Sequence, residues 1–179
     1  MKQFLKKHIR LVIVIVVLFI IYMGYLTSKQ SVNVDEKLDK AISDYIIEHN
    51  KSGYEESSYK AFEAHKIYGV EEKDDLINVY MYSLQEVYSF VDKKFKLQGS
   101  WSEPVFMAFK NYNGKYSVIE YKEAEVGSKD LESMMEIFPR EYAKKAIYDD
   151  AQSTGLYFHI RKQAKKWLKE EGKGDFPLE

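Results

Sequence analysis

The chain begins with a continuous apolar run and then alternates between helical and strand-like hydrophobic periods. Residues 11–26 read LVIVIVVLFIIYMGYL and carry no charged side chain. A bilayer core needs roughly 20 helical residues at about 1.5 Å each, and neighbouring residues extend this run toward that length. The run is apolar on every side, without the polar stripe of a helix in a soluble domain. We therefore predict a transmembrane anchor at residues 11–28.

Charges before the anchor predict its orientation. Four basic residues and no acidic one precede the run: Lys2, Lys6, Lys7 and Arg10. By the positive-inside rule, residues 1–10 form a cytoplasmic basic tail and residues 29–179 an extracytoplasmic domain of a single-pass cell-membrane protein. A cleaved signal peptide, with cleavage after Ser28, is the alternative. Residues 23–28 include bulky side chains where a cleavage site needs small residues, which favours an uncleaved anchor.

A helix is predicted directly after the anchor. Residues 33–36 have the form of a capping box, with Asn33 as the N-cap and Glu36 reaching back. Apolar residues then follow on one helical face: Leu38, Ala41, Ile42, Tyr45 and Ile46. We expect this helix to end at His49-Asn50, with Gly53 beyond it.

The middle of the chain has the period and composition of β-strands. Candidate strands cover residues 60–69, 76–90, 95–97, 105–110 and 116–123. Asn113-Gly114 is the strongest hairpin signal in the chain, and Gly99-Ser100 marks another turn. These segments predict an antiparallel meander of four or five strands.

The C-terminal region returns to the helical period. A short apolar helix at residues 134–138 ends at Pro139, and residues 142–147 lead into a second stretch. After a break at Gly155, a longer helix carries an apolar stripe: Leu156, Ile160, Ala164, Trp167 and Leu168. The order of helix, meander and helices predicts an α+β domain with one sheet face covered by helices. Our specific prediction is a cystatin-like arrangement, in which one helix lies across a curved sheet.

Composition narrows the class of function. The chain has 27 Lys and Arg against 28 Asp and Glu, and removing the basic tail leaves a net charge of −5. This mildly acidic balance argues against nucleic acid as a partner. There is no cysteine, so disulfides and lipid attachment at a lipoprotein cysteine are excluded. Hydrophobic residues make up 45% of the chain, which is enough for one domain to be stabilised by its hydrophobic core without disulfides.

Two carboxylate–imidazole pairs are candidate ligand-binding residues. Glu48 precedes His49, and Glu63 shares a predicted strand face with His65. Metal-ligand spacing and the H-E-x-x-H motif are absent, so we predict no metal and no cofactor. There is no G-x-S-x-G elbow, and we expect no enzyme. A hydrolase would require His49, His65 and a carboxylate to converge, whereas structural roles for both histidines are the simpler interpretation.

Two further groups of side chains are candidates for contacts. Five tyrosines could line an aromatic groove for a small ligand, or they could pack on the sheet: Tyr80, Tyr82, Tyr88, Tyr116 and Tyr121. A run of basic residues lies opposite the apolar stripe of the last helix: Arg161, Lys162, Lys165, Lys166 and Lys169. Such a face could contact membrane head groups or a cell-wall polymer, or it could simply be solvated.

Five segments, taken in order, resemble one extracytoplasmic domain of Gram-positive bacteria. They are AISDYIIEHN (41–50), FEAHKIYGVEE (62–72), VYSFVDKKF (87–95), NGKYSVIEY (113–121) and IFPREYAKKA (137–146). That domain follows membrane zinc metallopeptidases of the β-lactam-sensor type, and it also occurs in related stand-alone membrane proteins. The resemblance covers about residues 40–147 and implies a sensing or interaction module. It implies no proteolysis, because the zinc motif of the peptidase is missing here.

We therefore predict a single-pass membrane protein with a non-catalytic extracytoplasmic sensing or interaction domain. Its expected partners are the lipid bilayer and a protein of the membrane or envelope. A receptor for a small ligand is the alternative function, and an envelope hydrolase is the third.

Overall fold

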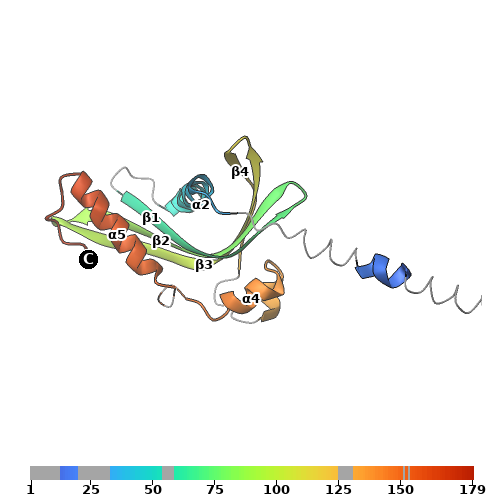
Figure 1. Cartoon of the computed structure of the whole chain (residues 1–179). Helices are drawn as coiled ribbons and strands as arrows, with labels where there is room; N and C mark the ends of the chain where they lie inside the picture. Colours follow the sequence, from blue (N-terminus) through green and yellow to red (C-terminus); the bar gives the residue numbers. More distant parts are fainter. Residues whose placement is uncertain (1–12, 20–32, 54–58, 125–130, 151, 153) are drawn as a thin grey trace, which may run out of the picture.

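The computed structural model describes residues 13–19, 33–53, 59–124, 131–150, 152 and 154–179. Beyond a helical segment at residues 13–19, the described residues form an α+β domain with one four-stranded sheet (Figure 1). An N-terminal helix, an antiparallel meander and C-terminal helices follow one another, which confirms the predicted class and element order.

Helix α2 (Glu36–His49) begins two residues later than the predicted cap implied. Asp35, not Asn33, is the N-cap, and its Oδ1 accepts a hydrogen bond of 2.8 Å from Leu38 N. Asp35 prevails because this bond satisfies one of the backbone N–H groups that a helix start leaves open. The helix continues into a 3-10 turn, η1 (Asn50–Gly53).

The sheet is a simple meander in which every neighbouring pair is antiparallel. Its strands are β1 (Tyr59–Lys73), β2 (Leu76–Val91), β3 (Lys94–Tyr112) and β4 (Lys115–Glu123). Both residues of each connecting turn have positive φ: Asp74-Asp75, Asp92-Lys93 and Asn113-Gly114. This conformation is typical of two-residue hairpins, because its twist matches that of the flanking strands.

The prediction of a turn at Gly99-Ser100, and with it the five-strand alternative, is wrong. Residues 95–97 and 105–110 belong to one strand, β3, because both segments pair with β2. Val87 lies opposite Gly99 and Tyr88 opposite Leu97, so the chain accommodates Gln98 as a bulge and does not reverse.

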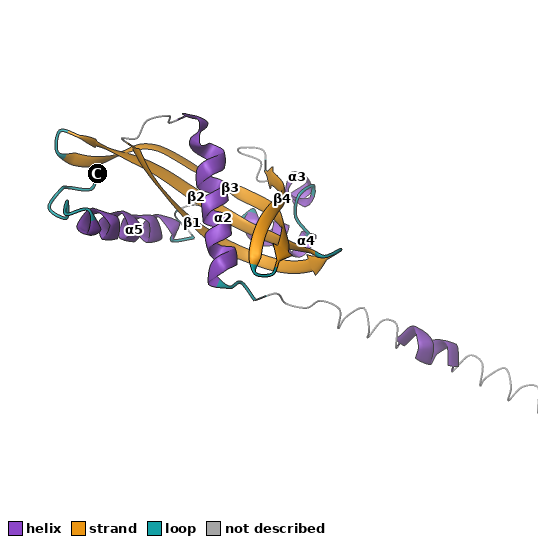
Figure 2. Cartoon of the chain, turned by 90° about the horizontal axis from the view of Figure 1, so that it is seen from above, coloured by secondary structure: helices purple, strands orange, loops and turns teal. Residues whose placement is uncertain are grey.

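Helices cover both faces of the sheet, and not one face as predicted (Figures 1 and 2). Helix α2 crosses one face, and its Leu38 and Ile42 pack with Val79 and Met81 of β2. The other face carries α3 (Leu131–Met135), α4 (Arg140–Ala146) and α5 (Leu156–Glu170). Strand β2 is therefore buried on both sides. Burial on both faces explains its long apolar and aromatic run, because such a strand has no solvent-facing side that would require polar residues.

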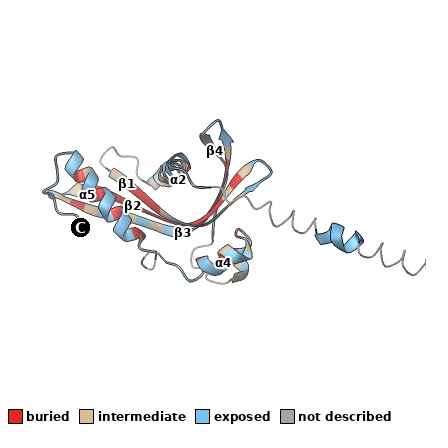
Figure 3. Ribbon diagram, in the orientation of Figure 1, coloured by how far each residue is buried: buried red, intermediate tan, exposed pale blue. Residues whose placement is uncertain are grey.

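Helix α5 has the predicted stripe on its inner face. Leu156, Ile160, Ala164 and Leu168 are buried, while the outer side of the helix is exposed (Figure 3). The last residues then return to β3, where Phe95 N donates to Pro177 O at 2.8 Å.

The predicted anchor at residues 11–28 lies largely outside the described residues, which include only 13–19 of it. None of the helices in the described part of the chain combines the length and the apolar character that a membrane crossing requires.

Candidate functional site

A buried polar cluster joins α2 to β1, and it contains two of the predicted residues, Glu63 and His65. Nδ1 of His65 lies 3.1 Å from Oε2 of Glu63, and its Nε2 lies 3.2 Å from Oδ1 of Asp39 on α2. Hydroxyls from both sides complete the cluster, because Ser43 and Ser83 donate to Glu63 at 2.7 and 3.0 Å. The Glu63 side chain is fully buried and only 6% of the His65 side chain is exposed.

The charge of His65 follows from these contacts. Burial by itself would lower the pKa of His65, but the hydrogen bonds and negative charges of Asp39 and Glu63 outweigh it and raise this pKa to about 9. The imidazole is then protonated at neutral pH, with a carboxylate at each ring nitrogen. Such a ring has no free nitrogen to act as a general base, so the cluster is suited to holding α2 on the sheet.

His49 lies in a different cluster, near the end of α2. Its ring centroid is 5.6 Å from that of Tyr45 and 4.5 Å from that of Tyr121. Asp39, the partner of His65, precedes His49 by ten residues, which is about 15 Å of helix rise. The convergence of His49 and His65 that a hydrolase would have required is absent. Glu48 accepts a hydrogen bond of 3.0 Å from Lys51, which belongs to neither histidine cluster.

Two carboxyl groups beside His49 were not anticipated from the sequence. Burial and the neighbouring Glu123 raise the pKa of Glu103 to about 7. Tyr121 donates to Glu123 Oε1 at 2.5 Å, and His49 Nε2 lies 3.9 Å from the same oxygen. The hairpin at residues 113–114 contained part of the signal, because counting back along both strands from this turn brings residue 123 opposite residue 104. A bulge between Ala108 and Phe109 then moves Glu123 opposite Val105, and either register leaves it near Glu103.

Tyr80 and Tyr82, two of the predicted groove tyrosines, are packed in the core and line no open groove. Both are only 7% exposed and face α3, α4 and α5. The Tyr80 ring lies 5.6 Å from Phe138 and 5.1 Å from Tyr142, centroid to centroid. Tyr82 donates to Ser102 Oγ at 3.3 Å. These two tyrosines therefore pack on the sheet face, which was the alternative interpretation.

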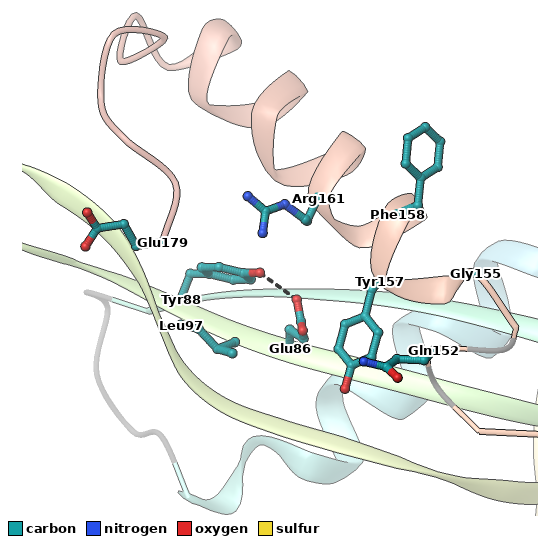
Figure 4. Close-up of a pocket in the computed structure, with 9 residues that line it drawn as sticks. All are labelled: Glu86, Tyr88, Leu97, Gln152, Gly155, Tyr157, Phe158, Arg161 and Glu179. Carbon is teal, nitrogen blue, oxygen red and sulfur yellow. Dashed lines mark hydrogen bonds between the residues drawn. The ribbon is translucent and has the colours of Figure 1, made fainter.

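An open pocket of about 540 Å³ lies between the first turns of α5 and the sheet (Figure 4). Its lining comes from β2, β3, α5 and the segments that flank α5: Glu86, Tyr88, Leu97, Gln152, Gly155, Tyr157, Phe158, Arg161 and Glu179. The volume falls in the range of small-molecule sites. Of the predicted residues, Tyr88 and Arg161 contribute to this lining.

A buried carboxylate and an exposed guanidinium characterise the pocket. Glu86 is 3% exposed, and burial raises its pKa, while a hydrogen bond from Tyr88 and the charge of Arg161 lower it. Tyr88 donates to Glu86 Oε2 at 2.5 Å. Glu86 escaped sequence analysis because an acidic residue in a strand is ordinarily solvent-facing, and only the position of α5 buries this one.

The other basic residues of α5 lie outside this pocket. Lys162, Lys165, Lys166 and Lys169 are exposed, and of these only Lys166 has an ion-pair partner within the described residues, Glu170 at 3.8 Å. Across the described ranges, no three His, Asp or Glu side chains are grouped so as to hold a metal ion.

Comparison of the chain with protein-family models, with curated proteins and with solved structures finds no match.

Proposed function

We propose that the chain is a single-pass membrane protein whose domain at residues 29–179 is a non-catalytic extracytoplasmic sensing or interaction module. The observation that carries this proposal is the exposed basic surface of α5, which we call the basic face: Lys162, Lys165, Lys166 and Lys169, with Arg161 at its edge toward the pocket. All five side chains are exposed on a domain that is otherwise acidic. Unbalanced charge of one sign on a single face attracts a partner of the opposite charge.

The helical segment at residues 13–19 supports the anchor. Its side chains are all apolar, and between 48% and 61% of each is exposed. A contiguous apolar surface of this kind is usually covered by lipid or by another protein. The basic tail at residues 1–10 then fixes a cytoplasmic N-terminus.

The histidine clusters support a role without catalysis. His65 has a carboxylate at each ring nitrogen, and His49 lies apart from it, packed against two tyrosines. The resemblance to the extracytoplasmic domain of the β-lactam-sensor type and the cystatin-like arrangement of one helix on a curved sheet form part of this proposal. Of these two, the resemblance points to recognition of an envelope or membrane partner.

In-cell crosslinking of the full-length protein in its own membrane tests the proposal. A variant with Lys162→Gln, Lys165→Gln and Lys169→Gln removes three charges from the basic face. Its matched control carries Lys37→Gln, Lys73→Gln and Lys115→Gln, three exposed lysines on other elements. We expect a reproducible membrane or envelope partner with the wild type and the control, and its loss with the α5 variant.

Two outcomes would contradict the proposal. Equal capture of the partner by the α5 variant and by its control would show that the basic face is not the contact surface. Recovery of the protein in the medium without its first residues would show that the apolar segment is cleaved and does not serve as a membrane anchor.

A receptor for a small ligand is the second candidate function, and the pocket beside α5 favours it. A concave site with a few converging polar groups among apolar side chains is the usual form of a small-molecule site. Glu86, Tyr88 and Arg161 are such groups here.

A further inference from the structure

Three charged residues line the pocket, and one of them, Glu179, is paired with Lys94. The other two face the pocket from different walls and carry opposite charges. Glu86 comes from β2 and Arg161 from α5, and both side chains line the cavity (Figure 4). Arg161 acts on the pKa of Glu86 through its charge, but no ion pair or hydrogen bond joins the two side chains in the described structure. A gap between them is therefore open to a ligand.

One oxygen of Glu86 is available from this gap. Tyr88 occupies Oε2. Among the described residues, Tyr68 Oη is the only fully buried side-chain oxygen or nitrogen without a hydrogen-bond partner. No hydrogen bond to Oε1 of Glu86 is found among the described residues, yet Oε1 is not among the fully buried atoms without a partner. This oxygen is therefore open to solvent, and the pocket that Glu86 lines gives access to it. A buried glutamate with one open oxygen is suited to a charged donor such as an ammonium group.

The opposite wall is suited to an anion. Helix α5 begins after Gly155, has no side-chain cap and has no acidic residue in its first turn. The first N–H groups of such a helix and the positive end of its dipole attract negative charge. Arg161 lies on the same wall, since Gly155, Tyr157 and Arg161 all line the pocket.

Apolar surface connects the two charged ends. Phe158 is 71% exposed, Leu97 43% and Tyr157 37%, and all three line the cavity. Large apolar side chains held open at a pocket with charged groups gain free energy when an apolar group of a ligand covers them.

We propose that this pocket binds a zwitterion with an apolar side chain, either a free amino acid or a short peptide. Its ammonium group pairs with Glu86, and its carboxylate pairs with Arg161 and the start of α5. A cation without an anionic group would be repelled by Arg161, and an anion without a cationic group would be repelled by Glu86. The inference rests on the second candidate function, the small-ligand receptor, and it names the class of ligand.

Calorimetric titration of the full-length protein in detergent micelles at neutral pH tests the proposal with four probes. Phenylalanine carries both charges, N-acetylphenylalanine lacks the ammonium, phenylalaninamide lacks the carboxylate, and leucylphenylalanine separates the two charges by one more residue. We expect phenylalanine or the dipeptide to bind, and the better of the two identifies a free amino acid or a peptide as the source. The two singly charged probes should bind at least about tenfold more weakly, since each loses a charged hydrogen bond.

Variants assign the two ends of the ligand. Arg161→Gln should weaken binding of the zwitterion about tenfold, while Lys165→Gln, an equal loss of charge one turn along α5, should leave it unchanged. Glu86→Gln should weaken it similarly. Because Glu86 is buried, thermal unfolding of that variant without ligand shows whether it folds, and the exposed Arg161 provides the decisive variant if it does not.

The proposal is overturned if no probe binds, if a singly charged probe binds as tightly as the zwitterion, or if Arg161→Gln and Lys165→Gln have equal effects. These outcomes are independent of the crosslinking result. A partner lost with the α5 variant would support the interaction module even if every probe failed to bind.

Discussion

Tyr142 on α4 occupies the space that a side chain at Gly69 on β1 would need. A Cβ at position 69 would lie 2.1 Å from Tyr142 Cζ, far inside van der Waals contact. The position coincides with a shift of register, because Ile67 lies opposite Met81 and Gly69 opposite Tyr80. The hydroxyl of Tyr142 donates to Glu71 Oε1 at 3.2 Å. Glycine is thus needed here for the close approach of a helix.

Gly69→Ala should destabilise the domain by about 1–3 kcal/mol, the usual cost of extra volume in a packed site. The Tyr142 ring must move and its neighbours must repack. Urea unfolding measures the change. Gly174→Ala is the control, because a Cβ there meets mainly the flexible side chain of Lys169 at 3.3 Å, and we expect a change below about 0.5 kcal/mol. Equal effects of the two substitutions would show that Tyr142 relaxes freely.

His65 should make stability fall as pH rises from about 6.5 to about 9. Its folded pKa is about 9 against an ordinary value of 6.5, so in this window the folded chain keeps a proton that the unfolded chain releases. The stabilisation is complete below pH 6.5 and amounts to about 3 kcal/mol. NMR titration gives the pKa, and urea unfolding at several pH values gives the slope.

The matched variants for this prediction are His65→Gln and His49→Gln. The first should flatten the decline of stability above pH 6.5, and the second should leave it in place. A His65 that titrates near 6.5 in the folded protein would contradict the ion pairs with Asp39 and Glu63.

Glu103 should affect stability in a lower range of pH than His65. Burial and Glu123 raise its folded pKa to about 7 from an ordinary 4.5, so the unfolded chain releases its proton first as pH rises. Glu103 therefore costs nothing below pH 4.5 and reduces stability progressively between 4.5 and 7. Glu103→Gln should raise the melting temperature at pH 8 more than at pH 4.5. Glu72→Gln, at an exposed strand end, should show no such difference.

Lys93→Gly should stabilise the turn between β2 and β3. Lys93 has φ +61°, a left-handed conformation that costs a residue with a side chain roughly 1–2 kcal/mol. Glycine removes this strain but adds about 0.5–1 kcal/mol of backbone entropy loss on folding, so the net gain should be about 0.5–1 kcal/mol by urea unfolding. Lys96→Gly, inside the extended strand β3, carries the entropy cost alone and should destabilise. A loss of stability from both would contradict strain at position 93.

The local pattern of the sequence determined the class of the fold. The apolar spacing of α2 and α5 gave their inner faces correctly, because a helix repeats every 3.6 residues whatever it packs against. Asn113-Gly114 located its hairpin, since both residues tolerate positive φ. The turns at Asp74-Asp75 and Asp92-Lys93 have the same conformation, and three of their four residues are aspartates, which also tolerate positive φ.

Only the tertiary structure decided which side chains meet. Glu86 and Arg161 are 75 residues apart along the chain, and their shared pocket exists because α5 packs across β2. His65 and Asp39 likewise meet only when α2 lies on β1. Contacts between distant segments depend on how whole elements dock, and hydrophobic periodicity specifies the face of each element that is buried but not the element that covers it. For this reason the sequence predicted the helices and the meander, while the pocket, the carboxyl pair and the buried imidazolium required the assembled domain.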